Sequence, residues 1–545
     1  MQKTQLGWII SGEMHGGTSS TACFVASNDA LQRQLETFWK IEEGVDNHMY
    51  SLEEQACEDN FMKNTTYGND DRYSVHLPFK REPKDLGDSY TGALRRLQAM
   101  ENKFAKNKLL KEQYVAFMRE YETLGHMVQI KDHENSFGDV HYLPHHAVYK
   151  QSSTTTKLRV VFDASCKTST GLSLNDILMV GPTIQQDLFA ILIRFRQYPY
   201  VITADIRQMY RQIYVTDKHQ DLQRILWRED PSQPIKIFKL RTVTYGMAAS
   251  PFLAIRCLHQ AAKEGEMEFP EASQIIRRDF YVDDMITGAN TVEHIQRIKD
   301  EVTAVLQSVG FPLHKWVSNT SITSAEDSDG TTDFTHRIGE EMKTLGILWN
   351  HRDDNLQYNT KPPSISGRVT KRCILSTVSQ IFDPLGLVAP IIVTAKILLQ
   401  ELWQLKLGWV EAVPLHVHTR WLHYVKHLSY IRDIAIPRLT VITNPVRVEI
   451  NAFCDASEVA YGACVYIRSE DALNNCSSRL LCAKSRVAPL SKISLPRLEL
   501  CGALLLARLH RRVVEALTIN IQTHYYWCDS TITLAWIAGD PQTSI

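Results

Sequence analysis

The chain has 545 residues, of which 44% are hydrophobic, so it can form several folded domains and is not a disordered polymer. Its formal net charge of −1 excludes a uniformly basic surface, so any contact with nucleic acid must come from local patches. The 11 cysteines include no Cys-x-x-Cys pair, and we identify no secretion signal, so we expect reduced thiols in the cytoplasm or nucleus. Pro390 and Lys396 interrupt the apolar run at 385–403, so we expect no membrane insertion.

The first 72 residues carry little regular patterning. A short apolar run at 6–12 ends in glycine and predicts a strand, and residues 31–43 have a helical pattern. The run at 6–12 resembles the last strand of a retroviral-type aspartic protease, whose catalytic Asp-Thr/Ser-Gly turn is absent from this sequence. We therefore expect a protease remnant at 1–13 and a linker with a helix at 14–72.

The next segments alternate between strand and helix patterns. We expect a strand at 73–80, a helical stretch at 89–125 and a strand at 160–162 with Arg159 at its start. A planar guanidinium binds phosphate oxygens in pairs, so Arg159 is a candidate phosphate ligand, with an ordinary surface arginine as the alternative. A helix at 185–196 then leads into a buried strand that ends at Asp205.

Three strands and one helix are expected between Asp205 and the central acidic pair. Strands are expected at 212–215, 224–227 and 235–243, paired as a meander. A helix at 252–264 leads to the pair, and another helix is expected at 292–309 after it.

The central acidic pair, Asp283 and Asp284, lies in the motif Tyr281-Val282-Asp283-Asp284. Its β-forming flanks predict a short hairpin with both aspartates at the turn. Adjacent carboxylates repel each other, and a hard divalent cation removes the cost of burying them. An acidic surface turn is the alternative, and the apolar neighbours Phe280, Met285 and Ile286 argue against it.

The Tyr-Val-Asp-Asp motif, the strand-end Asp205 and the intervening segment Tyr245-Gly-Met-Ala-Ala-Ser-Pro251 resemble the palm motifs of reverse transcriptases, in the same order. The resemblance implies that Asp205 and Asp283 hold two Mg²⁺ ions, with Mn²⁺ as an alternative, and that Asp284 supports the site. A pair of such ions suits phosphoryl transfer, because it holds both the attacking and the leaving oxygen.

The same resemblance implies a nucleotide-binding set. Arg159 would grip the incoming triphosphate, and Tyr210, five residues after Asp205, would lie under the sugar and select deoxynucleotides. Gly246 and the small residues after it would let the chain approach template and nucleotide closely. Tyr245 departs from the family, which has Gln or Phe at this position. A core tyrosine is the alternative for Tyr210.

The segments after the palm have separate signatures. Residues 318–336 are rich in Ser, Thr, Asp and Asn and predict a flexible loop. Residues 342–349 resemble the hairpin that holds the primer end, and residues 375–390 resemble the thumb and connection region of Pao/BEL long-terminal-repeat retrotransposon polyproteins. We expect fingers and palm at 73–317 and a thumb or connection-like region at 337–442.

Three more carboxylates stand near the C-terminus. Asp455 and Asp529 each end an expected strand, and Glu499 is expected in the first turn of a helix at 496–516. Strand-Asp, helix-Glu and strand-Asp in this order resemble ribonuclease H, which implies a second two-metal site that cleaves the RNA of a hybrid. The expected domain, 443–545, lacks the family's fourth acidic position, so we expect it to be truncated, with little or no cleavage.

The sequence thus predicts an α+β multidomain chain: a right-hand polymerase palm, fingers and thumb, followed by a truncated ribonuclease H-like α/β domain. The expected function is RNA-directed DNA polymerase. Its expected partners are an RNA template, a DNA primer, an RNA–DNA hybrid and deoxynucleoside triphosphates. We expect a cytoplasmic virus-like particle or the nucleus as its location, and the oligomeric state stays open.

Two other functions remain as alternatives. One is a non-catalytic nucleic-acid-binding retrotransposon remnant, which the intact Asp205, Asp283 and Asp284 disfavour. The other is an aspartic-type peptidase, suggested by Asp455-Ala-Ser. It is disfavoured because the peptidase turn needs a glycine where Glu458 stands.

Overall fold

The computed structural model describes residues 2–4, 7–9, 50–68, 70–130, 139–149, 158–321, 342–344, 347–358 and 368–539. The expected strand near residue 6 is β2 (Gly7–Ile9), which pairs antiparallel with β1 (Gln2–Thr4). The helix predicted at 31–43 and most of the loop predicted at 318–336 lie outside the described residues.

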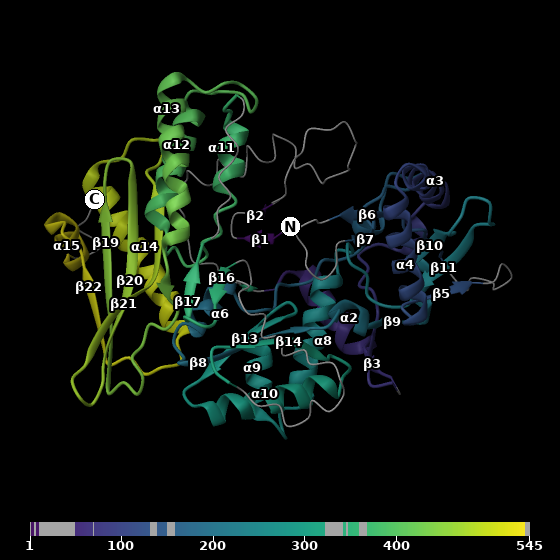
Figure 1. The fold of residues 1–545 in the computed structure, drawn as a ribbon, viewed down its shortest axis with the longest axis horizontal. Helices are drawn as coiled ribbons and strands as arrows, with labels where there is room; N and C mark the ends of the chain where they lie inside the picture. The colour runs from purple at the N-terminus through teal and green to yellow at the C-terminus, as the bar shows by residue number, and fades with distance from the viewer. Residues whose placement is uncertain are drawn as a thin grey trace.

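One end of the molecule is built from two helices and short sheets (Figure 1). The helical stretch predicted at 89–125 is two helices, α3 (Tyr90–Lys106) and α4 (Lys108–Thr123). They divide at Asn107, whose side chain accepts a hydrogen bond from the N–H of Leu110 at 3.0 Å and so caps α4.

The strands of this end form three small sheets. One sheet has the order β10 (Arg224–Trp227), β11 (Lys236–Leu240), β5 (Met127–Ile130), and another pairs β6 (His145–Tyr149) with β7 (Leu158–Phe162). The predicted meander is wrong in part, because β9 (Tyr214–Val215) pairs in parallel with β4 (Tyr73–Val75). The long-range partner satisfies the backbone of β9, which is too short to form a ladder with its neighbours in sequence.

The palm-like centre is an antiparallel sheet in the order β12 (Phe280–Tyr281), β13 (Asp284–Ala289), β8 (Tyr200–Ile206), β14 (Leu313–Ser318). Side chains alternate along β8, so the two faces of the sheet enter different cores. Ile202, Ala204 and Ile206 pack with helices α8 (Ser250–Glu264) and α10 (Val292–Gln307). Val201, on the other face, packs with α6 (Leu188–Phe195).

Helix α6 joins the palm sheet to the other end of the molecule. Its buried side chains belong to one core with α11 (Lys371–Val378), α12 (Ala389–Gln404) and α13 (Leu415–Leu428). A small antiparallel sheet lies beside them. Its strands are β15 (Met342–Thr344), β16 (Ile347–Asn350), β17 (Asn355–Gln357) and β18 (Ile436–Pro437). The hairpin predicted at 342–349 corresponds to β15 and β16, which pair antiparallel.

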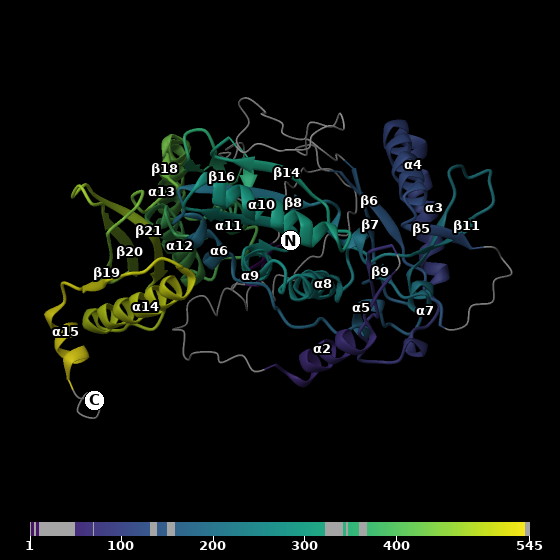
Figure 2. The ribbon, with the colours of Figure 1, turned by 90° about the horizontal axis from the view of Figure 1, so that it is seen from below.

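The C-terminal part is a four-stranded sheet with one long helix on it (Figure 2). Its order is β21 (Cys476–Val487), β20 (Ala460–Glu470), β19 (Arg447–Ala456), β22 (Thr523–Trp527), with β22 parallel to β19. Helix α14 (Leu495–Ala516) packs on β19 and β20, and helix α15 (Thr531–Ala538) follows β22. The α+β multidomain class is confirmed.

Within the described ranges, no helix is both long enough and apolar enough to cross a membrane.

Candidate active sites

The palm sheet brings the first three predicted carboxylates onto adjacent strands. Asp205 near the end of β8 lies opposite Asp284 of β13 on one side and His314 of β14 on the other. Asp283 lies in the turn before β13, and its carbonyl accepts a hydrogen bond from the N–H of Ile206 at 2.8 Å. One detail of the prediction is wrong: Asp284 is the first residue of the strand, opposite Tyr281, and only Asp283 lies in the turn.

The three carboxyl groups have different electrostatic surroundings. Burial, and then the charges of Asp283 and Asp205, raise the pKa of Asp284 to about 7. Burial and Asp205 also raise the pKa of Asp283. Burial alone would raise the pKa of Asp205, but it is lowered overall because His314 Nε2 donates to Oδ1 at 2.7 Å and Lys315 Nζ lies 3.4 Å from Oδ2.

These shifts fit a cation-binding role, because a hard divalent cation would offset the repulsion that helps to raise the pKa of Asp283 and Asp284. Within the described part of the chain, however, the oxygens of Asp205, Asp283 and Asp284 do not gather as a set of three within 4.8 Å.

A buried ionic network that the sequence did not reveal holds the base of the acidic hairpin. Asp279 is 1% exposed and accepts hydrogen bonds from Arg194 Nε at 2.7 Å, Arg278 Nη2 at 3.0 Å and Thr287 Oγ1 at 2.9 Å. Because Arg194 lies on α6 and Thr287 on β13, the network fixes the start of β12 against both. The only local signal was an acidic residue immediately before a strongly apolar strand.

The turn itself has an unusual backbone. Val282 has a φ of +60°, a conformation that β-branched residues rarely adopt, and its N–H donates to Gln185 Oε1 at 3.2 Å. A strained residue beside two carboxylates is typical of a functional site, since the surrounding structure must impose it.

The predicted nucleotide-binding residues lie around the same carboxylates. The rings of Tyr210 and Tyr245 are 4.4 Å apart between centroids, and burial, Tyr245 and Asp283 together raise the pKa of Tyr210. Arg159 is exposed on β7, and its charge acts on both Asp283 and Tyr245. Asp283 therefore interacts electrostatically with both Arg159 and Tyr210.

Gly246 lies where only a glycine fits. Its φ is +98°, and a Cβ there would lie 2.7 Å from the carbonyl oxygen of Phe162 on β7. The side chain of Asn175 holds this turn: its Nδ2 donates to the Gly246 carbonyl at 2.9 Å, and its Oδ1 accepts from the N–H of Ala248 at 2.8 Å. Asn175 was not identified from the sequence, because its partners are more than 70 residues away.

The second predicted set lies at one end of the C-terminal sheet. Asp455 is near the end of β19, Asp529 follows β22, and Glu499 lies on α14, in its second turn and not its first. Gly502, one turn after Glu499, brings the helix close to the sheet, because a Cβ there would be only 3.4 Å from the carbonyl oxygen of Asp455.

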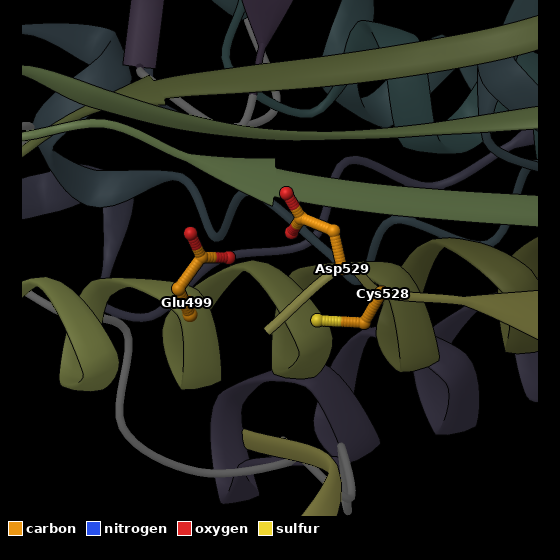
Figure 3. Close-up of side chains that lie close together, drawn as sticks. All are labelled: Glu499, Cys528 and Asp529. Atoms are coloured by element: carbon orange, nitrogen blue, oxygen red, sulfur yellow. The ribbon is translucent and has the colours of Figure 1, made fainter. Parts of the chain in front are cut away.

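The three carboxylates of the second set differ in their exposure to solvent. Glu499 is 7% exposed, and burial, then Asp455 and Asp529, raise its pKa. Asp455 and Asp529 are exposed, and Asp455 Oδ1 accepts from the N–H of Ala456 at 2.7 Å. Among the described residues, the group whose ligand atoms all lie within 4.8 Å of one another is Glu499, Cys528 and Asp529, so Cys528 takes the place expected for Asp455 (Figure 3).

Two family models match the chain in succession. Residues 148–321 match the model described as reverse transcriptase (RNA-dependent DNA polymerase), which covers the palm carboxylates. Residues 370–530 match the model described as Pao retrotransposon-like RNaseH-like domain, which covers Asp455, Glu499 and Asp529 and begins inside the segment predicted as thumb and connection. No curated protein sequence matches the chain.

Solved structures give a weaker likeness. A foamy viral protease-reverse transcriptase in complex with double-stranded DNA is 15% identical, with a TM-score of 0.48 over 91% of this chain and 79% of that one. A foamy viral protease-reverse transcriptase in complex with an RNA/DNA hybrid is 14% identical, with a TM-score of 0.47 over 91% of this chain and 60% of that one. These values are too low to assign residues.

Proposed function

Because the chain belongs to the Pao/BEL retrotransposon polyproteins, with a reverse transcriptase region followed by an RNaseH-like domain, it is an RNA-directed DNA polymerase, and we propose that Asp205, Asp283 and Asp284 form its polymerase site. The observation that carries this proposal is the register of the palm sheet, which sets Asp284 directly opposite Asp205 beside the Asp283 turn. Reverse transcriptases use divalent metal ions, and the all-carboxylate donor set fits a hard cation.

We assign the cation as Mg²⁺, with two ions held by Asp205 and Asp283 and supported by Asp284. When bound, such ions activate the primer 3′-hydroxyl and neutralise charge on the pyrophosphate leaving group. His314 and Lys315 keep Asp205 ionised, and the buried Asp279 network fixes the hairpin that carries Asp283. Catalysis then depends mainly on positioning and electrostatics.

The substrates follow from the surrounding residues. Arg159 binds phosphate oxygens of a deoxynucleoside triphosphate, Tyr210 lies under the sugar, and Gly246 allows close approach of the chain. The polymer partners are an RNA template, a DNA primer and the resulting hybrid. Because contacts with backbone phosphates release counterions and carry no sequence information, we expect binding to be salt-sensitive and largely independent of sequence.

Primer extension on an RNA template, with and without Mg²⁺, tests this function. The expected result is DNA synthesis that requires the cation and stops in a chelator. A folded protein that binds primer–template without extending it under any divalent cation would instead support a non-catalytic binding protein.

Replacing Tyr210 with valine is expected to let ribonucleotides in. The smaller side chain removes the ring that would exclude a 2′-hydroxyl, so the preference for deoxynucleotides should fall by at least about tenfold, equivalent to about 1.4 kcal/mol. Competing single-nucleotide incorporation measures this preference. The matched control is Tyr424→Val, because both tyrosines are 9% exposed and Tyr424 lies on α13. An unchanged preference in the Tyr210 variant would make this residue a packing residue.

We propose that Asp455, Glu499 and Asp529 form the hydrolytic site of the RNaseH-like domain. The expectation of little or no cleavage stays a prediction, and release of labelled RNA from an RNA–DNA hybrid measures it. Any cleavage that is observed should be lost in Glu499→Gln, which keeps the shape and removes the charge. Cleavage that survives this change would come from another site or from a contaminant.

A further inference from the structure

The group at the end of the C-terminal sheet contains a thiol as well as carboxylates. Glu499 on α14 and Cys528 and Asp529 after β22 each offer one ligand atom, and these atoms lie within 4.8 Å of one another. Figure 3 shows the Cys528 sulfur and the Glu499 and Asp529 carboxylates gathered between the helix and the strand. The sequence analysis predicted the acids but assigned no role to the cysteine between them.

A second observation is that one carboxylate oxygen of this group accepts no hydrogen bond. The Glu499 side chain is buried, with an exposed fraction of 7%, and its Oε2 accepts no hydrogen bond from any described residue. An unpaired, buried carboxylate oxygen is costly to maintain, so it requires a ligand that can satisfy it. Asp529 offers a second carboxylate within the same 4.8 Å, so a cation is the ligand that would satisfy both groups at once.

The neighbouring Cys454 does not compete for this role. It is buried on β19, and its thiol donates to the carbonyl of Trp527 at 3.7 Å. Cys528 is only half-buried and is therefore the sulfur that can reach an ion.

We propose that Glu499, Cys528 and Asp529 form a mixed carboxylate–thiolate site for a borderline-soft divalent cation of the zinc class. Hard cations such as Mg²⁺ bind oxygen ligands, whereas a thiolate favours Zn²⁺ and Co²⁺. Three protein ligands leave a fourth tetrahedral position for water, as in many zinc sites. Since Glu499 and Asp529 also belong to the proposed hydrolytic site, a bound soft cation would compete with the Mg²⁺ that hydrolysis needs.

Only the competition with Mg²⁺ rests on the proposed hydrolytic site. Metal binding itself is measured without an assay of hydrolysis. The probe is Co²⁺ added to the full chain under a phosphine reductant, with the near-ultraviolet thiolate-to-cobalt absorption as the readout. The palm carboxylates and the His510–His524 pair contribute no thiolate, so this absorption reports a cysteine ligand alone. We expect the band to appear, to saturate at one equivalent, and to persist in a large excess of Mg²⁺.

Variants assign the ligands. Cys528→Ser should remove the band and weaken Zn²⁺ binding at this site at least about tenfold, whereas the exposed Cys476→Ser should leave both unchanged. Glu499→Gln should weaken Co²⁺ binding while the thermal unfolding temperature stays near that of the unaltered chain. No band in the unaltered chain, or a band that survives Cys528→Ser, would overturn the proposal. A band without hybrid cleavage would leave the metal site standing and count only against hydrolysis.

Discussion

Asp283→Asn should lower the rate of DNA synthesis by at least about 10³-fold while the fold is retained. A charged ligand at this position contributes several kcal/mol to the transition state through the bound cation, and each 1.36 kcal/mol is a factor of ten. Asparagine has the same shape and no charge. Because burial and Asp205 raise the pKa of Asp283, removing its charge also relieves repulsion within the palm.

The measurement is single-nucleotide incorporation on an RNA template with saturating Mg²⁺, together with thermal unfolding. We expect the variant to unfold at the same temperature as the unaltered chain, or higher, without cation, and to gain less stability when Mg²⁺ is added. Asp300→Asn is the matched control, because Asp300 is an exposed acid on α10 that accepts only from Gln296 among its described neighbours. Synthesis at a near-normal rate by a folded Asp283→Asn protein would refute the assignment.

The strand-end carboxylates could be predicted because local patterns determine them. Apolar β-forming runs before Asp205 and Asp455 predict buried strands, and an acid at the end of such a run must lie at the end of its strand. The start of helix α15 is also set locally, since Ser530 caps it by accepting from the N–H of Thr533 at 3.3 Å.

The residues that hold the site could not be predicted, because their partners are distant in sequence. Arg194 and Asp279 are 85 positions apart, and Asn175 and Gly246 are 71 positions apart. No periodicity encodes such pairs. Val282 could not be predicted either. Its backbone is left-handed, a conformation that the local propensity of valine disfavours, so the folded chain must impose it.

The failed meander has a similar cause. The segment 212–215 has strand-forming residues, but its first residue ends a 3-10 turn (Met209–Gln212), which leaves only Tyr214 and Val215 to pair. Those two residues reach β4, about 140 positions earlier in the chain, and contact the segment after β11 through a single bridge from Tyr214 to Thr242. For a strand this short, closeness in the sequence is therefore weak evidence for which strand it pairs with.

Replacing Arg438 is expected to have the largest effect on the stability of the chain. Its side chain is fully buried, and it lies where the palm meets the C-terminal half. Nε and Nη2 donate to the two carboxylate oxygens of Asp354 at 2.6 and 2.7 Å, and Nη1 donates to the carbonyls of Phe195 and Tyr198, the latter at 2.8 Å. The segment from Phe195 to Tyr198 leads directly into β8, which carries Asp205.

Arg438→Met is therefore expected to destabilise the chain by about 3–5 kcal/mol, because it removes the cation that pairs with the Asp354 carboxylate and leaves several buried carbonyls without their donor. In urea this should lower the midpoint of unfolding by about 1 M or more. Tryptophan fluorescence can follow the transition, since Trp349 Nε1 donates to the same Asp354 at 3.0 Å. The control is Arg420→Met, which breaks an exposed pair with Glu401 and should cost at most about 1 kcal/mol.

If the two variants unfolded at the same urea concentration, the buried network would not be what joins the two halves of the molecule. A larger loss in the Arg438 variant, accompanied by weaker DNA synthesis below the midpoint, would show that this arginine also positions the strand that carries Asp205.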